Sequence, residues 1–217
     1  AKKGKNLSLI STGWDPGLFS MARVLAQSVL PEGTDYTFWG KGVSQGHSDA
    51  VRRVPGVKNA VQYTVPIQSA LDAARSGANP KLTTREKHKR ICYVVAEPGA
   101  DEAAIRKAIV EMPNYFADYD TEVNFVTEEV LKRDHAGLPH GGFVLRTGKT
   151  GAASKQIVEF RLQLDSNPEF TASVMIASAR AVHRMRKAGR TGAVTVFDLP
   201  IGLLSPQSPE QLRKGQL

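Results

Sequence analysis

The sequence Ser11-Thr12-Gly13-Trp14-Asp15-Pro16-Gly17 joins an alternating apolar segment, residues 7–10, to a segment with helical spacing of apolar residues, 18–29. This pattern predicts a strand, a turn and an amphipathic helix. We expect Asp15 to cap the helix and Pro16 to occupy its first position. Ligands of open α/β sheets bind beyond the carboxyl ends of the strands, so Trp14 and Asp15 are candidate binding residues. An isolated motif of this kind would fit a capping Asp beside a packing Trp. A second aromatic turn that ends in glycine, at residues 38–40, favours a binding site.

The composition is that of an ordinary globular chain. It has 217 residues, of which 41% are apolar and 23% charged, enough for one or two domains with a core. No run of about 18 apolar residues occurs, so no membrane span is predicted. No signal peptide is recognisable, and the single cysteine, Cys92, cannot form an internal disulfide. We therefore expect a cytoplasmic location.

The net charge of +8 does not indicate nucleic-acid binding, because of how the basic residues are distributed. They gather at residues 2–5 and at the end of a predicted helix, residues 184–190, where cations offset the helix dipole. Aromatic residues do not alternate with them as in a base-stacking surface. A positive surplus also suits small anionic ligands such as carboxylates or phosphates.

A glycine-rich polar loop, residues 40–49, follows a predicted strand at 34–39. Its glycines let the backbone approach a ligand closely. We expect Ser48 or Asp49 to cap a short helix at 50–54, whose first N–H groups would bind an anion. A flexible surface loop is the alternative, but the polar residues run directly into the predicted helix start.

The remaining pattern mixes strands and helices with short connections. Strands are predicted at 58–65, 88–96, 121–125 and 192–198, a hairpin at 143–146 with 157–164, and helices at 66–76, 101–112, 128–131, 167–190 and 209–214. The second hairpin strand alternates, which predicts one buried and one solvated face. This order predicts an α/β fold with α+β character and an antiparallel part.

Two polar residues on these elements are candidates for ligand binding. Arg90 could bind a carboxylate with both arms of its guanidinium, although a solvated arginine on a sheet face is the commoner case. His140 stands between a proline and a glycine pair on a rigid turn, although a lone histidine is more often a bystander. Cys92 has no histidine or acid partner in the sequence, so we interpret it as a packing residue.

Other chemical motifs are absent from the sequence. The Gly148-Lys149-Thr150 run has the wrong spacing for a P-loop and leads into a strand. No metal-ligand spacing, nucleophile elbow or glycine-rich dinucleotide fingerprint occurs. From the residues alone, the candidate groups fit a zwitterionic or dicarboxylate ligand and go no further.

The sequence resembles the meso-diaminopimelate dehydrogenases, a family of NADP-dependent bacterial enzymes. The resemblance extends through nearly the whole chain and rests on residues 11–17, 37–40, 44–50, 52–53, 60–64, 88–90, 139–142, 167–168, 170–173 and 203–206. It implies reversible oxidative deamination at the D-centre of meso-2,6-diaminopimelate, which yields L-2-amino-6-oxopimelate, ammonia and NADPH. It also implies a homodimer and a role in the metabolism of diaminopimelate and lysine.

The resemblance also implies a role for individual residues. Asp15, the catalytic candidate, and Trp14 are expected beside the D-amino group, and the backbone of Gln45 and Gly46 at the D-carboxylate. The other implied substrate contacts are Phe38 and Trp39 along the pocket wall, Thr64, Arg90 and His140 at the distal L-carboxylate, and Asn167 nearby.

The sequence departs from the family at its N-terminus. Family members carry half of a Rossmann domain, with its glycine-rich phosphate turn, before the first strand seen here. We expect residues 1–15 and 191–217 to belong to the dinucleotide-binding domain, and residues 16–190 to form the substrate-binding and dimerisation domain. The main NADP contacts would then lie in the preceding segment. The alternative is a non-catalytic amino-diacid-binding or dimerisation fragment that needs a separate nucleotide-binding half.

Overall fold

The computed structural model describes all 217 residues, and their contacts divide the chain into two compact units. The first unit combines Ala1–Ser28 with Pro168–Leu217, and the second is the continuous stretch Val29–Asn167. From the sequence, we placed the boundaries between the dinucleotide-binding domain and the substrate-binding and dimerisation domain after residues 15 and 190. This assignment of functions to domains stays a prediction. The observed α/β architecture, with antiparallel pairing in the second unit, confirms the predicted fold class.

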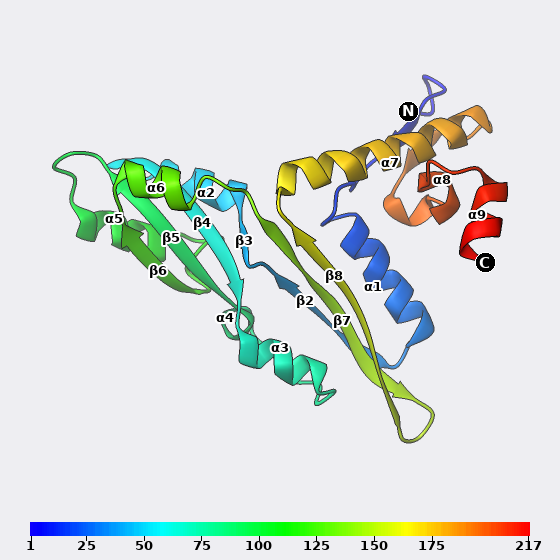
Figure 1. The fold of residues 1–217 in the computed structure, drawn as a ribbon, viewed down its shortest axis with the longest axis horizontal. Helices are drawn as coiled ribbons and strands as arrows, with labels where there is room; N and C mark the ends of the chain where they lie inside the picture. The colour runs from blue at the N-terminus through cyan, green and yellow to red at the C-terminus, as the bar shows by residue number, and fades with distance from the viewer. The chain divides into compact units, whose positions relative to one another are not determined.

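The first unit is built on a parallel pair of strands, β1 (Leu7–Leu9) and β9 (Gly192–Val194). Both ends of the chain, marked N and C in Figure 1, belong to this unit. Its helices are α1 (Leu18–Val29), α7 (Asn167–Lys187), α8 (Ile201–Leu204) and α9 (Pro209–Gln216), the first two each extending one residue into the other unit. Buried Ala181, Met185 and Leu199 pack with apolar residues of β1 and α8. The predicted last strand is shorter than expected, because Thr195 and Asp198 cap a 3₁₀ turn, η1 (Val196–Asp198).

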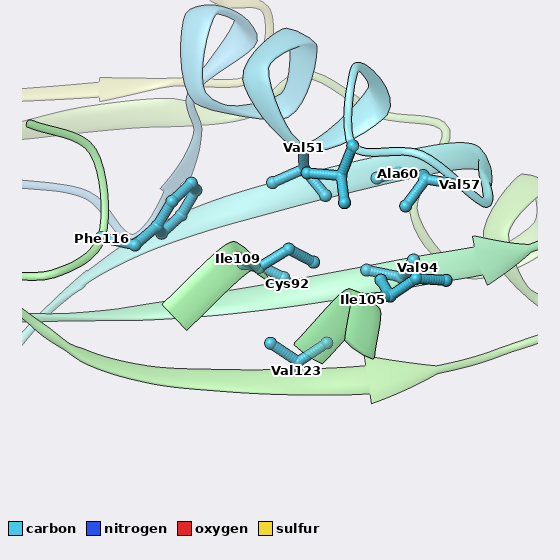
Figure 2. Packing of buried hydrophobic residues seen from close by; sticks show 10 residues of the cluster. Val51, Val57, Ala60, Cys92, Val94, Ile105, Ile109, Phe116 and Val123 are labelled. Atoms are coloured by element: carbon cyan, nitrogen blue, oxygen red, sulfur yellow. The ribbon is translucent and has the colours of Figure 1, made fainter. Parts of the chain in front are cut away.

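The second unit contains a four-stranded sheet in the order β3-β4-β5-β6. Its strands are β3 (Gly42–Val43), β4 (Val57–Pro66), β5 (His88–Ala96) and β6 (Asp120–Phe125). Figure 2 shows the core that α2 (Gln45–Arg52) and α5 (Glu102–Val110) form on this sheet. Cys92 is fully buried there, and burial raises the pKa of its thiol to about 12. These facts agree with its interpretation as a packing residue.

A separate three-stranded antiparallel sheet has the order β2-β7-β8. Its strands are β2 (Gly33–Trp39), β7 (His140–Thr150) and β8 (Ser154–Leu164), and α3 (Gln68–Arg75) packs against one face. The unit is completed by α4 (Thr84–Lys87) and α6 (Glu128–Asp134). The predicted hairpin is therefore confirmed. Its apolar face is less buried than expected, since Ile157 is 48% and Phe160 38% exposed.

Three predicted helix starts were wrong, and one of them is that of α3, which was predicted from residue 66 and begins at Gln68. Helix α1 begins at Leu18 because Gly17 packs tightly on Gly13, where an added Cβ would lie 1.8 Å from the carbonyl oxygen. Asp15 therefore does not cap α1. Helix α2 begins at Gln45, with Ser44 as its N-cap, so the expected helix at 50–54 starts five residues too late. None of the helices combines the length and apolar character needed to span a bilayer.

Candidate functional site

Arg90 is a buried cation without a carboxylate partner. Arg90 is 6% exposed, and no Asp or Glu forms an ion pair with it. The β4–β5 register places it opposite Thr64, whose Oγ1 accepts a hydrogen bond from Nη1. The guanidinium carbon lies 3.9 Å from the centroid of the Tyr119 ring, and Nε has no hydrogen-bond partner. Burial lowers the pKa of Arg90. A desolvated guanidinium of this kind is suited to an anionic ligand.

Arg146, in the same unit, is a second buried arginine, and its partners differ from those of Arg90. It is 3% exposed, and its Nη1 lies 2.8 Å from Oδ2 of Asp35. Its other donors bind the carbonyl oxygens of Leu30 at 2.5 Å and Pro31 at 2.7 Å. The fold therefore satisfies Arg146 with its own acceptors, whereas Arg90 keeps a donor without a partner.

His140 lies beside the Thr64–Arg90 pair. Gly42 of β3 pairs with Thr64, and a Cβ added to Gly42 would lie 2.5 Å from Cα of His140. The glycine thus leaves the space that the His140 backbone and ring occupy. Burial is the largest effect that lowers the pKa of His140, and the charge of Arg90 lowers it further, against a backbone hydrogen bond that raises it. The structure therefore brings together the three residues expected at the distal carboxylate.

The end of β2 places its two aromatic residues on opposite faces, as successive strand residues must be. Phe38 is wholly buried against α3, so its side chain has no surface that a ligand could touch. This corrects the expectation that Phe38 lines a pocket wall. Trp39 is only partly buried, and its ring stacks on His88 with centroids 5.4 Å apart. Of the two aromatic residues, Trp39 alone remains a candidate for the wall.

Gln45 and Gly46 form the first turn of α2. The Ser44 side chain does not cap the helix, because its Oγ makes a 2.7 Å hydrogen bond with Nδ1 of His47. A Cβ added to Gly46 would meet nothing within 4 Å, so there is open space beside this backbone. Uncapped N–H groups and the positive end of the helix dipole favour an anion at such a position.

Asn167 lies where β8 leads into α7. Its backbone N–H donates to the carbonyl oxygen of Leu138 at 2.9 Å, and Ser166 forms a bridge with Leu138. These bonds hold Asn167 against the segment that leads into His140. Asn167 therefore joins the same region of the second unit as Thr64, Arg90 and His140.

Trp14 and Asp15 belong to the first unit. Trp14 is buried edge-on against Phe19, with ring centroids 5.2 Å apart. Oδ1 of Asp15 accepts a 2.6 Å hydrogen bond from Nη2 of Arg23, one turn into α1. The capping role expected for Asp15 is thus replaced by a charge-assisted bond that fixes its carboxylate.

A pocket of about 670 Å³ opens on the second unit, beside the start of β7. Its cations are Lys41, Arg75 and Arg161, and Arg75 forms a bidentate pair with Glu159 at 2.6 and 3.0 Å. Of the residues predicted for ligand binding, only His140 reaches this pocket. No group of three or more His, Cys, Asp or Glu side chains is placed to hold a metal ion.

Sequence reasoning missed two residues that shape the site, His88 and Tyr119. Tyr119 covers the Arg90 guanidinium, and His88 contacts Trp39 through both a hydrogen bond and a ring stack. The period-2 pattern of β5 gave one signal for His88, since it shares a face with Arg90. No sequence signal could have paired it with Trp39, because that contact joins two different sheets.

Comparisons with known proteins identify the family. Residues 13–166 match the family described as the diaminopimelic acid dehydrogenase C-terminal domain. The meso-diaminopimelate D-dehydrogenase of Lysinibacillus sphaericus is 62% identical over 217 residues, which are 100% of this chain and 67% of that protein. The chain therefore spans about two thirds of the length of this relative.

Two solved structures of dehydrogenases are similar to this chain over its whole length. The C. glutamicum DAP dehydrogenase in complex with DAP has a TM-score of 0.94 and 50% identity, over 100% of this chain and 67% of that one. An engineered D-amino acid dehydrogenase bound to NADP+ has a TM-score of 0.88 and 47% identity, with the same coverage. These relatives are oxidoreductases, and the engineered one holds a nicotinamide cofactor, NADP+. The chain belongs to the meso-diaminopimelate D-dehydrogenase family and corresponds to the part of it that includes the C-terminal domain.

Proposed function

We propose that this chain carries the substrate-binding part of an NADP-dependent dehydrogenase that oxidatively deaminates the D-centre of meso-2,6-diaminopimelate. The observation that carries the proposal is Arg90, a buried guanidinium with no carboxylate partner, next to Thr64 and His140. A buried cation is costly unless an anion pairs with it. The carboxylate at the L-end of the substrate supplies that anion.

Selectivity for one centre requires contacts at both ends of the substrate, because both centres carry the same groups. Arg90, Thr64 and His140 bind the distal carboxylate, and Asn167 lies near them. The N–H groups of Gln45 and Gly46 bind the carboxylate of the D-centre, helped by the α2 dipole. A planar guanidinium that holds one end in a fixed geometry determines which centre can react.

Asp15 has the chemistry required at the reacting centre. Its carboxylate attracts the D-ammonium group and accepts one proton from it, which leaves the amine that can expel hydride. The hydride leaves the D-carbon for the oxidised cofactor, and water then replaces the nitrogen, which departs as ammonia. Arg23 holds the Asp15 carboxylate through the 2.6 Å bond.

The residues present fit part of a nicotinamide cofactor site. The turn at 11–17 follows the carboxyl end of β1 in a parallel strand pair, the position at which dinucleotides bind in such sheets. The 217 residues contain no glycine-rich phosphate turn. We therefore propose that NADP phosphates are held by a segment outside this sequence, and that bound NADP supplies the hydride acceptor beside Trp14 and Asp15.

The proposed protein is a cytoplasmic homodimer. Neighbouring apolar side chains exposed on α7, Met175 and Ile176, supply area for a subunit contact. Buried Cys92, kept as a thiol, is compatible with a reducing compartment.

Ligand-dependent thermal stability tests this function on the chain itself. We expect meso-diaminopimelate at 100 times its dissociation constant to stabilise the fold by about 2.7 kcal/mol, because it binds only the folded state. Pimelate, which lacks both amino groups, is the control and should stabilise less. NADP should add stability only when the preceding nucleotide-binding segment of a relative is joined to the chain. No stabilisation by meso-diaminopimelate would rule out the proposed substrate.

A chain that binds the substrate is not necessarily an enzyme. The joined protein is therefore assayed for NADPH formation with meso-diaminopimelate. Binding without any NADPH formation would identify the alternative, a non-catalytic amino-diacid-binding module.

A further inference from the structure

His88 connects the two sheets of the second unit. It starts β5 in the four-stranded sheet, and its Nε2 accepts a 2.8 Å hydrogen bond from the backbone N–H of Trp39, at the end of β2 in the other sheet. Because β2 is an edge strand, this N–H points away from its only neighbour, β7. The imidazole thus satisfies a donor that no strand can pair.

The His88 ring also contacts both aromatic side chains at the end of β2. It stacks on the Trp39 indole at 5.4 Å and 30°, and lies 5.8 Å from the Phe38 ring. His88 is 1% exposed, so these contacts exclude water. Residues held by one backbone hydrogen bond and one stacked ring have little freedom to turn.

We propose that His88 is a positioning residue: it fixes the Trp39 indole at a set place relative to the Arg90 guanidinium. Both His88 and Arg90 lie on one face of β5, two residues apart, so a single rigid strand carries both constraints. The inference rests on the proposed function in one respect, the contact of Trp39 with the substrate. The placement of Trp39 by His88 stands on the geometry alone.

The protonation state of His88 is compatible with this role. Nε2 can accept the Trp39 hydrogen bond only while it carries no proton. Burial, followed by the charges of Arg90 and Lys87, lowers the pKa of His88 to about 3. The imidazole therefore stays a hydrogen-bond acceptor at any pH at which the enzyme would work.

Two amide variants test whether position 88 requires a hydrogen bond to the Trp39 backbone N–H or only a polar side chain. In His88→Gln the amide oxygen can take the place of Nε2, whereas the side chain of His88→Asn is one methylene too short to reach Trp39. His135→Asn is the matched control, because His135 also stacks on an aromatic ring, Tyr93 at 3.8 Å, and hydrogen-bonds to Tyr63. His135 contacts the face of the sheet opposite to Arg90.

The kinetic test uses the protein joined to its nucleotide-binding segment. We expect His88→Asn to raise KM for meso-diaminopimelate about tenfold with a smaller change in kcat, His88→Gln to recover most of the loss, and His135→Asn to leave KM unchanged. A wild-type KM in folded His88→Asn would overturn the proposal. Equal KM values in the Gln and Asn variants would also overturn it, because the hydrogen bond would then be irrelevant.

A spectroscopic test keeps this inference separate from the proposed function. Trp39 is one of two tryptophans, so the near-ultraviolet circular dichroism that is lost on Trp39→Phe reports its environment. We expect that signal to change more in His88→Asn, which loses both the hydrogen bond and the stacked ring, than in His88→Gln, which keeps the hydrogen bond, whether or not the protein oxidises diaminopimelate. An unchanged Trp39 signal in folded His88→Asn would contradict positioning by His88.

Discussion

Arg90→Met is expected to weaken the binding of meso-diaminopimelate by about 100-fold, which corresponds to about 2.7 kcal/mol. Hydrogen bonds to charged groups contribute about 1.5–3 kcal/mol each, and the buried guanidinium has no carboxylate acceptor in the chain, only the side chains of Thr64 and Tyr119. Calorimetry on the chain, or KM in the joined protein, measures the effect. Arg90→Lys should bind with intermediate affinity, because lysine keeps the charge but loses the planar fork.

Arg90→Met should not lower the stability of the fold. Arg90 has no ion pair to lose, so its replacement by an apolar side chain of similar length removes a desolvated charge. The matched control is Arg146→Met, which breaks the bond to Asp35 and two bonds to backbone carbonyls. We expect a lower melting temperature for Arg146→Met and an unchanged or higher one for Arg90→Met. Wild-type affinity in Arg90→Met would exclude this arginine from the carboxylate site.

Asp15→Asn is expected to reduce kcat by about 10²–10⁴, the usual range for the loss of a positioned proton acceptor. The dissociation constant of the substrate should change far less, because the distal carboxylate contacts remain. The amide is nearly isosteric and can still accept the Arg23 hydrogen bond through its oxygen. Steady-state rates and calorimetric affinity, measured on the same preparation, separate the two effects. Unchanged turnover would refute the role of Asp15 in proton transfer.

Arg23→Met is the companion variant for this position. It keeps the Asp15 carboxylate but removes the donor that holds it at 2.6 Å. A smaller loss of kcat than in Asp15→Asn is expected, because the proton acceptor survives in a less defined orientation.

The strands were predictable because their signals are local. The strand β5 was predicted at its observed bounds, His88–Ala96, and β2 was predicted to within one residue from its β-branched and aromatic residues. The start of α1 was not predictable, because it depends on the close approach of Gly17 to Gly13. The start of α2 was missed because its first turn, Gln45 to Ser48, carries no apolar repeat.

The site was only partly predictable, for a reason that lies in tertiary structure. The face of β5 that carries His88, Arg90 and Cys92 looks polar in sequence, which normally indicates a solvated face. It is buried because α2, Phe116 and Tyr119 cover it, and they come from distant parts of the chain. Local pattern therefore identified Arg90 as a candidate, and only packing distinguished it from an ordinary surface arginine.

The most direct test of the account is a crystal structure of the joined protein with meso-diaminopimelate. We predict that the L-carboxylate lies within hydrogen-bond distance of the Arg90 guanidinium and Thr64 Oγ1, with Asp15 at the D-amino group. A substrate bound instead in the pocket lined by Lys41, Arg75 and Arg161, with Arg90 making no contact to either carboxylate, would contradict the account.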